Sequence, residues 1–253
     1  MTERPMNAPV PAPMRELVRH IIEHLEAAYG VPRLRRDRDP LDTLIETVLS
    51  QSTNDRNRDR AFARLKARFP TWDALRRAST REIAAAIRVG GLARIKSVRI
   101  KRILREIERR TGALDLSFLC RAPLEEALGF LRSLEGVGPK TAACVLLFAC
   151  GRPVFPVDTH IRRVAERLGL IPRRCSDERA HEQLGRLIPA RHCYAAHINL
   201  IRLGRDVCRP RNPRCEACCL VQYCAYANEM GSARGDRESD VPARRRIARE
   251  RAF

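Results

Sequence analysis

The feature that most constrains this chain is a short glycine turn between two apolar helical patterns. Apolar residues recur at helical spacing over residues 124–134 and again over residues 141–150, with Gly136 and Gly138 between them. So short a connection leaves room only for a tight turn, which predicts a helix-hairpin-helix. The second helix begins at this turn with its free N–H groups pointing outward, so the turn suits an anion such as a DNA phosphate.

Two polar residues could carry chemistry, one directly after this turn and one 18 positions further along the chain. Lys140 lies in the first turn of the second helix, where the helix dipole disfavours a cation. A surface lysine that contacts phosphate is the simplest explanation. Asp158 precedes a new amphipathic pattern and is predicted as its N-cap.

The charge balance favours a polyanionic partner. Lys and Arg number 49 against 30 Asp and Glu, a formal net charge of +19. Nucleic acid is the first candidate and an anionic membrane the second. Residues 142–150 form the longest apolar run, far below the ~20 residues of a membrane span, and residues 1–14 lack a signal-peptide core. We therefore expect no membrane partner and a cytoplasmic protein, associated with the nucleoid if the cell is prokaryotic.

The ten cysteines fall into two kinds by spacing. Cys208, Cys215, Cys218 and Cys224 lie close together, and in a reducing compartment four such thiolates predict a metal centre. The spacing alone does not choose between a four-thiolate zinc site and an iron–sulfur cluster. Apart from Cys219 beside this group, the others are predicted as ordinary core or surface residues and not as disulfide partners. These are Cys120, Cys144, Cys150, Cys175 and Cys193.

The rest of the chain is helical by pattern. Start signals are Asp39 with Pro40, Asp55, and the capping box that Ser79 forms with Glu82. The helices expected from these signals cover residues 14–29, 40–49, 55–69, 79–88 and 97–112. Period-2 alternation is almost absent, so we expect an all-α protein. The Pro-rich residues 1–13 and the basic residues 231–253 are expected to be disordered tails.

The ordered string over residues 134–168, with its glycine turn, Lys140 and Asp158, resembles the signature of the helix-hairpin-helix DNA glycosylases, and specifically of endonuclease III. The resemblance extends over roughly residues 14–226. It implies two helical domains with DNA across the cleft between them. One is a six-helix barrel domain over residues 39–151, and the other combines residues 14–38 with residues 152–230.

The family's motif assigns roles to the residues around the turn. By resemblance, Lys140 is the nucleophile and Asp158 its essential carboxylate. Gly136 and Gly138 match the hairpin glycines that bind a DNA phosphate. His160 matches a family histidine beside the catalytic aspartate, although a lone histidine here is more simply structural.

Further DNA contacts are implied in the first half of the chain. Leu92 matches the leucine that the family inserts where the damaged nucleotide leaves the stack, while the isoleucine usual two positions earlier is here Gly90. The family's gap-filling glutamine corresponds to Ser52 by direct counting or to the neighbouring Gln51. Asp55 matches an aspartate of the base pocket, and a cap of the next helix is an equally good role. Lys96, in the basic segment after Leu92, is counted with the DNA contacts.

The cysteine spacing matches the family's [4Fe-4S] motif at all four positions. The resemblance therefore implies a [4Fe-4S] cluster held by residues 208–224. Between the first two ligands, two prolines stiffen a loop that carries Arg209, Arg211 and Arg214. Such a loop would present its arginines to a phosphate backbone.

The resemblance implies a bifunctional DNA glycosylase and AP lyase, active as a monomer on duplex DNA that contains an oxidised pyrimidine or an abasic site. Two alternatives stay open. One is a monofunctional relative that removes adenine or mismatched thymine; such enzymes generally lack a hairpin lysine, so Lys140 argues against this reading. The other is a non-catalytic iron–sulfur DNA-binding protein, in which Asp158 would have no chemical task.

Overall fold

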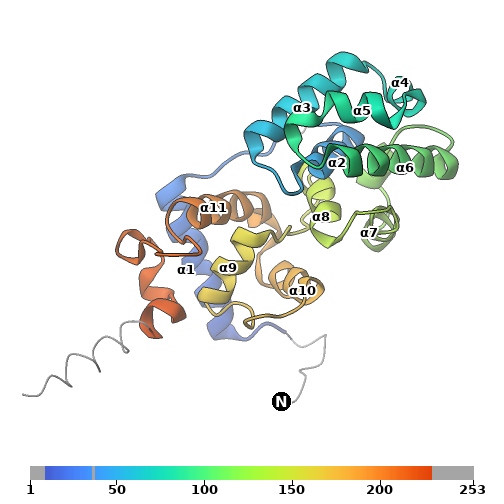
Figure 1. Cartoon of the computed structure of the whole chain (residues 1–253). Coiled ribbons are helices and arrows are strands. Elements are labelled where there is room, and N and C mark those ends of the chain that lie inside the picture. The colour runs from blue at the N-terminus through green and yellow to red at the C-terminus, as the bar shows by residue number, and fades with distance from the viewer. Residues whose placement is uncertain (1–8, 36–37, 230–253) are drawn as a thin grey trace, which may run out of the picture.

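The structure is a computed structural model that describes residues 9–35 and 38–229. Within these ranges every regular element is a helix, which confirms the all-α prediction for this part of the chain (Figure 1). No helix of the described ranges is long and apolar enough to cross a membrane. The α-helices are α1 (Ala12–Tyr29), α2 (Pro40–Ser50), α3 (Asp55–Arg68), α4 (Trp72–Arg77), α5 (Thr80–Ala86), α6 (Ala93–Thr111), α7 (Leu124–Arg132), α8 (Pro139–Phe148), α9 (Thr159–Arg167), α10 (Asp177–Leu187) and α11 (Cys193–Asp206).

The described ranges also contain five short 3-10 turns, and two of them lie among the clustered cysteines. They are η1 (Arg88–Gly90), η2 (Ser117–Cys120), η3 (Ala190–His192), η4 (Cys215–Ala217) and η5 (Val221–Tyr223).

The buried side chains form two separate cores. The first core is formed by the helices from α2 to α8. Helix α2 lies at its centre, where Leu44, Ile45 and Val48 are fully buried. The second core joins α9, α10 and α11, and α1 returns to it from the start of the chain (Figure 1). These two groups of helices are the first core and the second core below.

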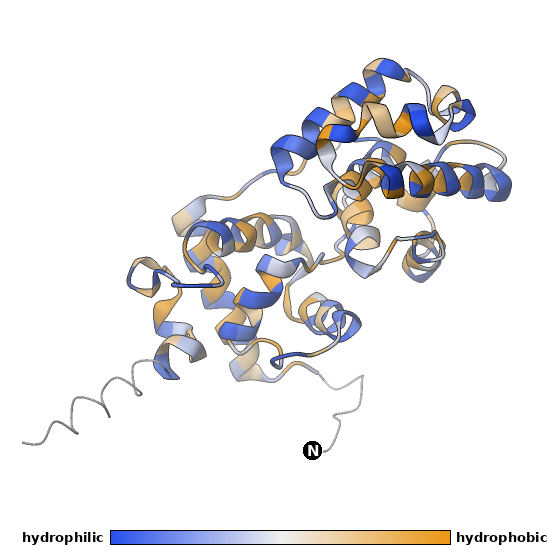
Figure 2. Cartoon of the chain, in the orientation of Figure 1, coloured by the Kyte–Doolittle hydropathy of each residue, from blue (hydrophilic) through white to orange (hydrophobic). Residues whose placement is uncertain are grey.

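Helix α8 belongs to both cores. Residues 141–147 are buried on all sides of this helix, and Figure 2 shows the helix coloured mainly as hydrophobic. Leu146 packs into the first core and Leu147 into the second. The helix that begins at the glycine turn is therefore the link between the two halves of the molecule.

The predicted start signals are mostly confirmed. The Asp39 side chain accepts a 2.8 Å hydrogen bond from the Asp42 amide, and Ser79 and Glu82 form the capping box. Helix α3 begins at Asp55 as expected, but the cap is Asn54. Helix α1 begins at Ala12, so the predicted tail over residues 1–13 is wrong at its end, because proline is tolerated in a first helical turn. Residues 1–8 and 230–253 lie outside the described residues.

Cys120 and Cys150 form a disulfide with a Cα–Cα distance of 4.8 Å. The prediction that both are ordinary unpaired residues is therefore wrong. The Arg152 guanidinium explains why these distant segments meet, since it donates to the carbonyls of Leu119 and Ala122 at 2.9 and 2.7 Å. Spacing in the sequence does not reveal such a contact.

Candidate active site and DNA interface

The glycine turn has the geometry expected of an anion site. Gly136 has a left-handed backbone with φ of 75°, which favours glycine, and a Cβ there would collide with the Arg99 side chain. Gly138 is exposed and caps α8 without a side-chain bond, and nothing lies within 4 Å of the place a Cβ would take. The first amides of α8 are thus open to a ligand that approaches Gly138 closely.

Lys140 and Asp158 lie at the starts of two successive helices. Lys140 is half-buried in the first turn of α8, and Asp158 is half-buried as the N-cap of α9, where its carboxylate accepts a 2.8 Å bond from the Ile161 amide. The charges of both residues act on the same two buried groups, Cys144 and His197, so both lie in the neighbourhood of these side chains. Burial raises the pKa of the Cys144 thiol, while the Lys140 charge and a hydrogen bond from Lys140 lower it.

His197 feels the charges of both Lys140 and Asp158, and nothing in the sequence points to it. It is 3% exposed on α11, and its Nδ1–H donates to the Pro156 carbonyl at 3.0 Å. Burial lowers its pKa to about 4, so the ring is neutral near pH 7. The imidazole therefore fixes the segment that leads into Asp158. A single histidine in an apolar helix carries no signal of this role.

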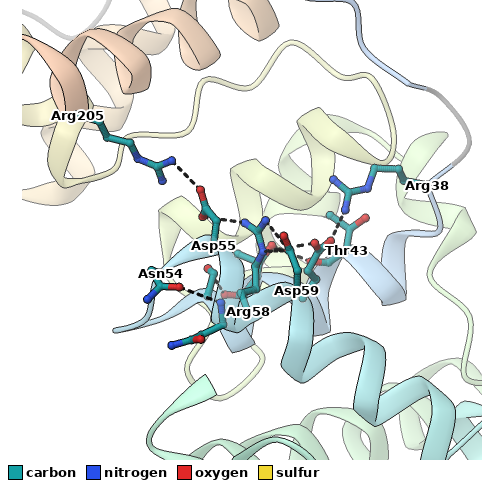
Figure 3. Close-up of polar contacts among 11 residues, drawn as sticks. Arg38, Thr43, Asn54, Asp55, Arg58, Asp59 and Arg205 are labelled. Atoms are coloured by element: carbon teal, nitrogen blue, oxygen red, sulfur yellow. Dashed lines mark hydrogen bonds and ion pairs between the residues drawn. The ribbon is translucent and has the colours of Figure 1, made fainter. Parts of the chain in front are cut away.

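Asp55 lies close enough to Lys140 to feel its charge. One carboxylate oxygen accepts a 2.6 Å hydrogen bond from Arg205, and the other accepts a 3.1 Å bond from Arg58 (Figure 3). The pKa of Asp55 is lowered, chiefly by the Arg205 bond and further by the charges of Arg58 and Lys140, against an opposing effect of burial. Asp55 is therefore held ionised at a contact between the two cores.

The predicted wedge and gap-filling residues lie in two loops with strained backbones. Leu92 is 52% exposed with φ of 47°, and the exposed Ser52 has φ of 53°. Gln51 instead points to the hairpin, where its amide donates to the Gly136 carbonyl at 3.2 Å and its oxygen accepts from Arg99 at 2.5 Å. Of the two candidates for the gap-filling residue, Ser52 is therefore the exposed one.

The prediction that Lys96 contacts DNA is wrong. Lys96 is 1% exposed, and its ammonium donates to the carbonyls of Leu49 and Gly90 at 2.8 Å each. Burial lowers its pKa. The lysine is buried because its ammonium satisfies carbonyls at the C-terminal ends of α2 and η1.

A model of the HhH-GPD superfamily of base excision DNA repair proteins matches residues 45–190. The chain belongs to this superfamily. It is by membership a DNA glycosylase of base excision repair, and the resemblance to endonuclease III is confirmed.

Several relatives agree with this assignment. Endonuclease III of Thermotoga maritima is 33% identical over 218 residues, which cover 86% of this chain and 95% of that one. An Arabidopsis thaliana protein assigned to the DNA glycosylases is 44% identical over 149 residues; these cover 59% of this chain but only 51% of that protein. The chain thus spans about half of the plant relative. A trapped endonuclease III–DNA covalent intermediate superposes with a TM-score of 0.72 at 26% identity, covering 86% of this chain and 98% of that one.

The four clustered cysteines of this glycosylase line one apolar pocket. Val207 and Tyr226 are among the other residues that line it, and Arg167 donates to Cys208 Sγ at 3.2 Å. The pKa of Cys218 is raised to about 11, chiefly by burial and in smaller part by the neighbouring thiols, against a backbone hydrogen bond from Leu220 that lowers it. Among the described residues no three His, Cys, Asp or Glu side chains are placed to hold a single metal ion.

The loop between the first two of these cysteines is exposed. Arg209 and Arg211 extend from it, and Arg214 donates to the Asp206 carbonyl at 2.5 Å. Two of the three predicted arginines are therefore free to meet a phosphate backbone, and the third holds the loop.

His160 of the glycosylase makes contacts between helices. Its Nδ1 lies 3.2 Å from an Arg163 guanidinium nitrogen, and a Cβ on Gly204 would come within 2.9 Å of its own Cβ. Helices α9 and α11 therefore approach closely at this histidine. Its predicted contact with DNA stays a prediction.

Proposed function

We propose that this glycosylase is bifunctional, and that it excises oxidised pyrimidines from duplex DNA and cuts the strand as an AP lyase. The observation that carries the proposal is the half-buried Lys140 at the hairpin, whose charge acts on the same buried groups as the charge of Asp158. The relative named DNA glycosylase/AP lyase ROS1, 30% identical over 64% of this chain, supports the lyase step. So does the similarity to a trapped covalent endonuclease III–DNA intermediate.

The proposed reaction begins with the damaged nucleotide flipped out of the duplex, which costs least where damage has weakened stacking. Neutral Lys140 attacks C1′ of the deoxyribose, the bond to the base breaks, and the base leaves with the electron pair. Asp158 stabilises the developing positive charge and accepts the lysine proton. Ring opening gives an imine, loss of the C2′ proton then expels the 3′ phosphate, and the strand is cut.

The two cores have complementary tasks in this proposal. The first core, over residues 39–151, presents the hairpin and Lys140, while the second, formed by residues 14–38 and 152–230, presents Asp158. DNA would lie across both, with one phosphate on the amides at Gly138 and others on Arg209 and Arg211. A single chain supplies every group needed, so we propose a monomer.

We propose that Cys208, Cys215, Cys218 and Cys224 hold a [4Fe-4S] cluster. Four thiols around one apolar pocket, with the Arg167 guanidinium beside Cys208, form a donor set that suits it. A bound cluster would fix the fold of residues 208–224 and so the direction of Arg209 and Arg211. Iron and acid-labile sulfide in equal amounts would support this assignment, whereas stoichiometric zinc would overturn it.

The decisive test of the function is borohydride trapping on duplexes that contain thymine glycol or an abasic site. The wild type should form a reduced covalent adduct that is absent with Lys140→Ala and much slower with Asp158→Asn. Lys66→Ala is a suitable control, because Lys66 pairs with Asp42 within the first core. No wild-type adduct, together with base release, would indicate a monofunctional enzyme; tight binding without either would indicate a binding protein.

A further inference from the structure

Three large apolar side chains stand exposed in a row on α6 and at its start. Leu92, Ile95 and Val98 are 52%, 57% and 38% exposed, and they account for half of the exposed large apolar residues in the described ranges. Their spacing places them along one side of the helix. We call these three residues the apolar stripe. A cluster of exposed apolar groups of this kind marks an interaction surface.

The stripe is continuous with the hairpin. Arg99 and Arg102 follow Ile95 by about one and two helical turns, so the three share one face of α6. Arg99 lies across Gly136, and Arg102 donates to the Glu135 carboxylate at 2.8 and 2.9 Å. Ile95 therefore lies on the side of the helix that borders the glycine turn.

Buried contacts hold the start of the stripe rigidly. Lys96 follows Ile95 in the sequence and is buried, and its ammonium donates hydrogen bonds to the carbonyls of Leu49 and Gly90. The left-handed Leu92 backbone costs roughly 1–2 kcal/mol and is kept in place by these contacts. Gly90 offers no apolar side chain of its own, because a Cβ there would lie 3.1 Å from Ala61 Cβ. Since Gly90 has no side chain to offer beside Leu92, the nearest exposed large apolar residue in the sequence is Ile95.

The surroundings of the stripe fit DNA. Exposed Arg94 lies next to Ile95, and exposed Arg102, which pairs with Glu135, lies two turns further on. Basic side chains beside apolar ones match phosphates on either side of a base stack. We propose that Ile95 forms, with Leu92, a two-residue apolar wedge that packs into the base stack of the duplex at the lesion. This proposal rests on the proposed glycosylase function and adds a residue to its DNA-distorting surface.

The test compares wild type with Ile95→Ser on a duplex that carries a tetrahydrofuran abasic-site analogue opposite 2-aminopurine. We expect the Kd for this duplex to rise about tenfold, because an apolar side chain of this size no longer becomes buried on binding. The rise in 2-aminopurine fluorescence on binding should fall with it. The Kd for an undamaged duplex should stay unchanged, because the wedge enters only where the stack is broken.

Val31→Ser is the matched control, since Val31 is 63% exposed and lies outside α6. An Ile95→Ser protein that binds and distorts the abasic duplex like the wild type overturns the wedge, provided the wild type forms the borohydride adduct. An equal loss in Val31→Ser overturns it as well. A wild type that neither prefers the abasic duplex nor forms the adduct refutes the proposed function, and the wedge with it.

Discussion

Arg205 at the end of α11 donates a 2.6 Å hydrogen bond to the Asp55 carboxylate at the start of α3, and this ion pair connects the two cores near Lys140. Both side chains are 46% exposed, so the pair contributes less than about 1 kcal/mol to the stability of the fold. Its larger effect concerns charge placement. Arg205 and Arg58 each donate to one oxygen of Asp55, so this carboxylate does not pair with Lys140. In the proposed reaction Lys140 must be neutral to attack.

Removal of Arg205 should therefore slow the chemistry more than it weakens the fold. In Arg205→Ala, Asp55 is free to stabilise the protonated form of Lys140, and we expect the single-turnover rate of adduct formation to fall about tenfold, an effect of about 1.4 kcal/mol. Urea denaturation should change by less than about 1 kcal/mol. Both quantities are measured on the same preparation.

The double variant Arg205→Ala/Asp55→Asn identifies the cause. Because it removes the freed carboxylate, its rate should recover relative to the single variant. Arg202→Ala, one turn earlier on α11, is a suitable control because Arg202 donates to the Tyr29 carbonyl. A double variant as slow as Arg205→Ala would show that Arg205 acts by another route, such as direct contact with DNA.

Lys96 should matter for stability although it carries a charge. Lys96→Met keeps the length of the side chain but leaves the carbonyls of Leu49 and Gly90 buried without a donor. At about 1–3 kcal/mol for each unsatisfied group, partly offset by removal of the buried ammonium, we expect the free energy of unfolding to fall by about 2–4 kcal/mol. Arg94→Met, on the exposed side of the same helix, should change it by less than about 0.5 kcal/mol. Equal urea midpoints for the two variants would contradict this assignment.

The start and end signals of the helices could be predicted because each acts within one turn of chain. Ser79 and Glu82 satisfy one another's backbone donors regardless of the rest of the fold. The glycine turn with Lys140 and Asp158 could be picked out for the same reason, together with its family resemblance. Their proximity to one another is a property of the folded chain.

Residues whose role depends on distant segments could not be predicted in this way. Lys96 has the sequence context of a surface lysine, and only the fold brings the carbonyls of Leu49 and Gly90 to its ammonium. His197 likewise acquires its role from Pro156, which belongs to a different segment. Helical periodicity indicates which face is buried, but it does not indicate what that face meets.

His197 makes the stability of the fold depend on pH. Burial lowers its pKa to about 4 from 6.5, so below pH 6.5 the unfolded chain binds a proton that the native state rejects. This contribution to stability is complete above about pH 6.5 and is lost as the pH falls towards 4, and the loss amounts to about 2 kcal/mol by pH 5. Urea titrations of the wild type and His197→Gln between about pH 7.5 and 5 should show a weaker pH dependence for the variant. Burial also lowers the pKa of His181, which contributes equally to both proteins. Parallel pH dependences would contradict the assignment.

The Cys120–Cys150 disulfide should stabilise the first core by restricting the unfolded chain. The two residues are 30 apart in sequence, and closure of a loop of this size is worth about 3–4 kcal/mol in the chain-entropy treatment. Cys120→Ser/Cys150→Ser should lose about that much free energy of unfolding, and its stability should not respond to dithiothreitol. The wild type in dithiothreitol should approach the double variant.

Mass spectrometry tests the bond itself. Alkylation of the denatured, unreduced wild type should modify eight of the ten cysteines, because eight are free in the structure, and prior reduction should raise the number to ten. Alkylation of all ten without reduction would mean that the pair stays reduced in the purified protein. Cys120 and Cys150 would then be the ordinary thiols that their positions in the sequence predict, and the two serine substitutions would cost little stability.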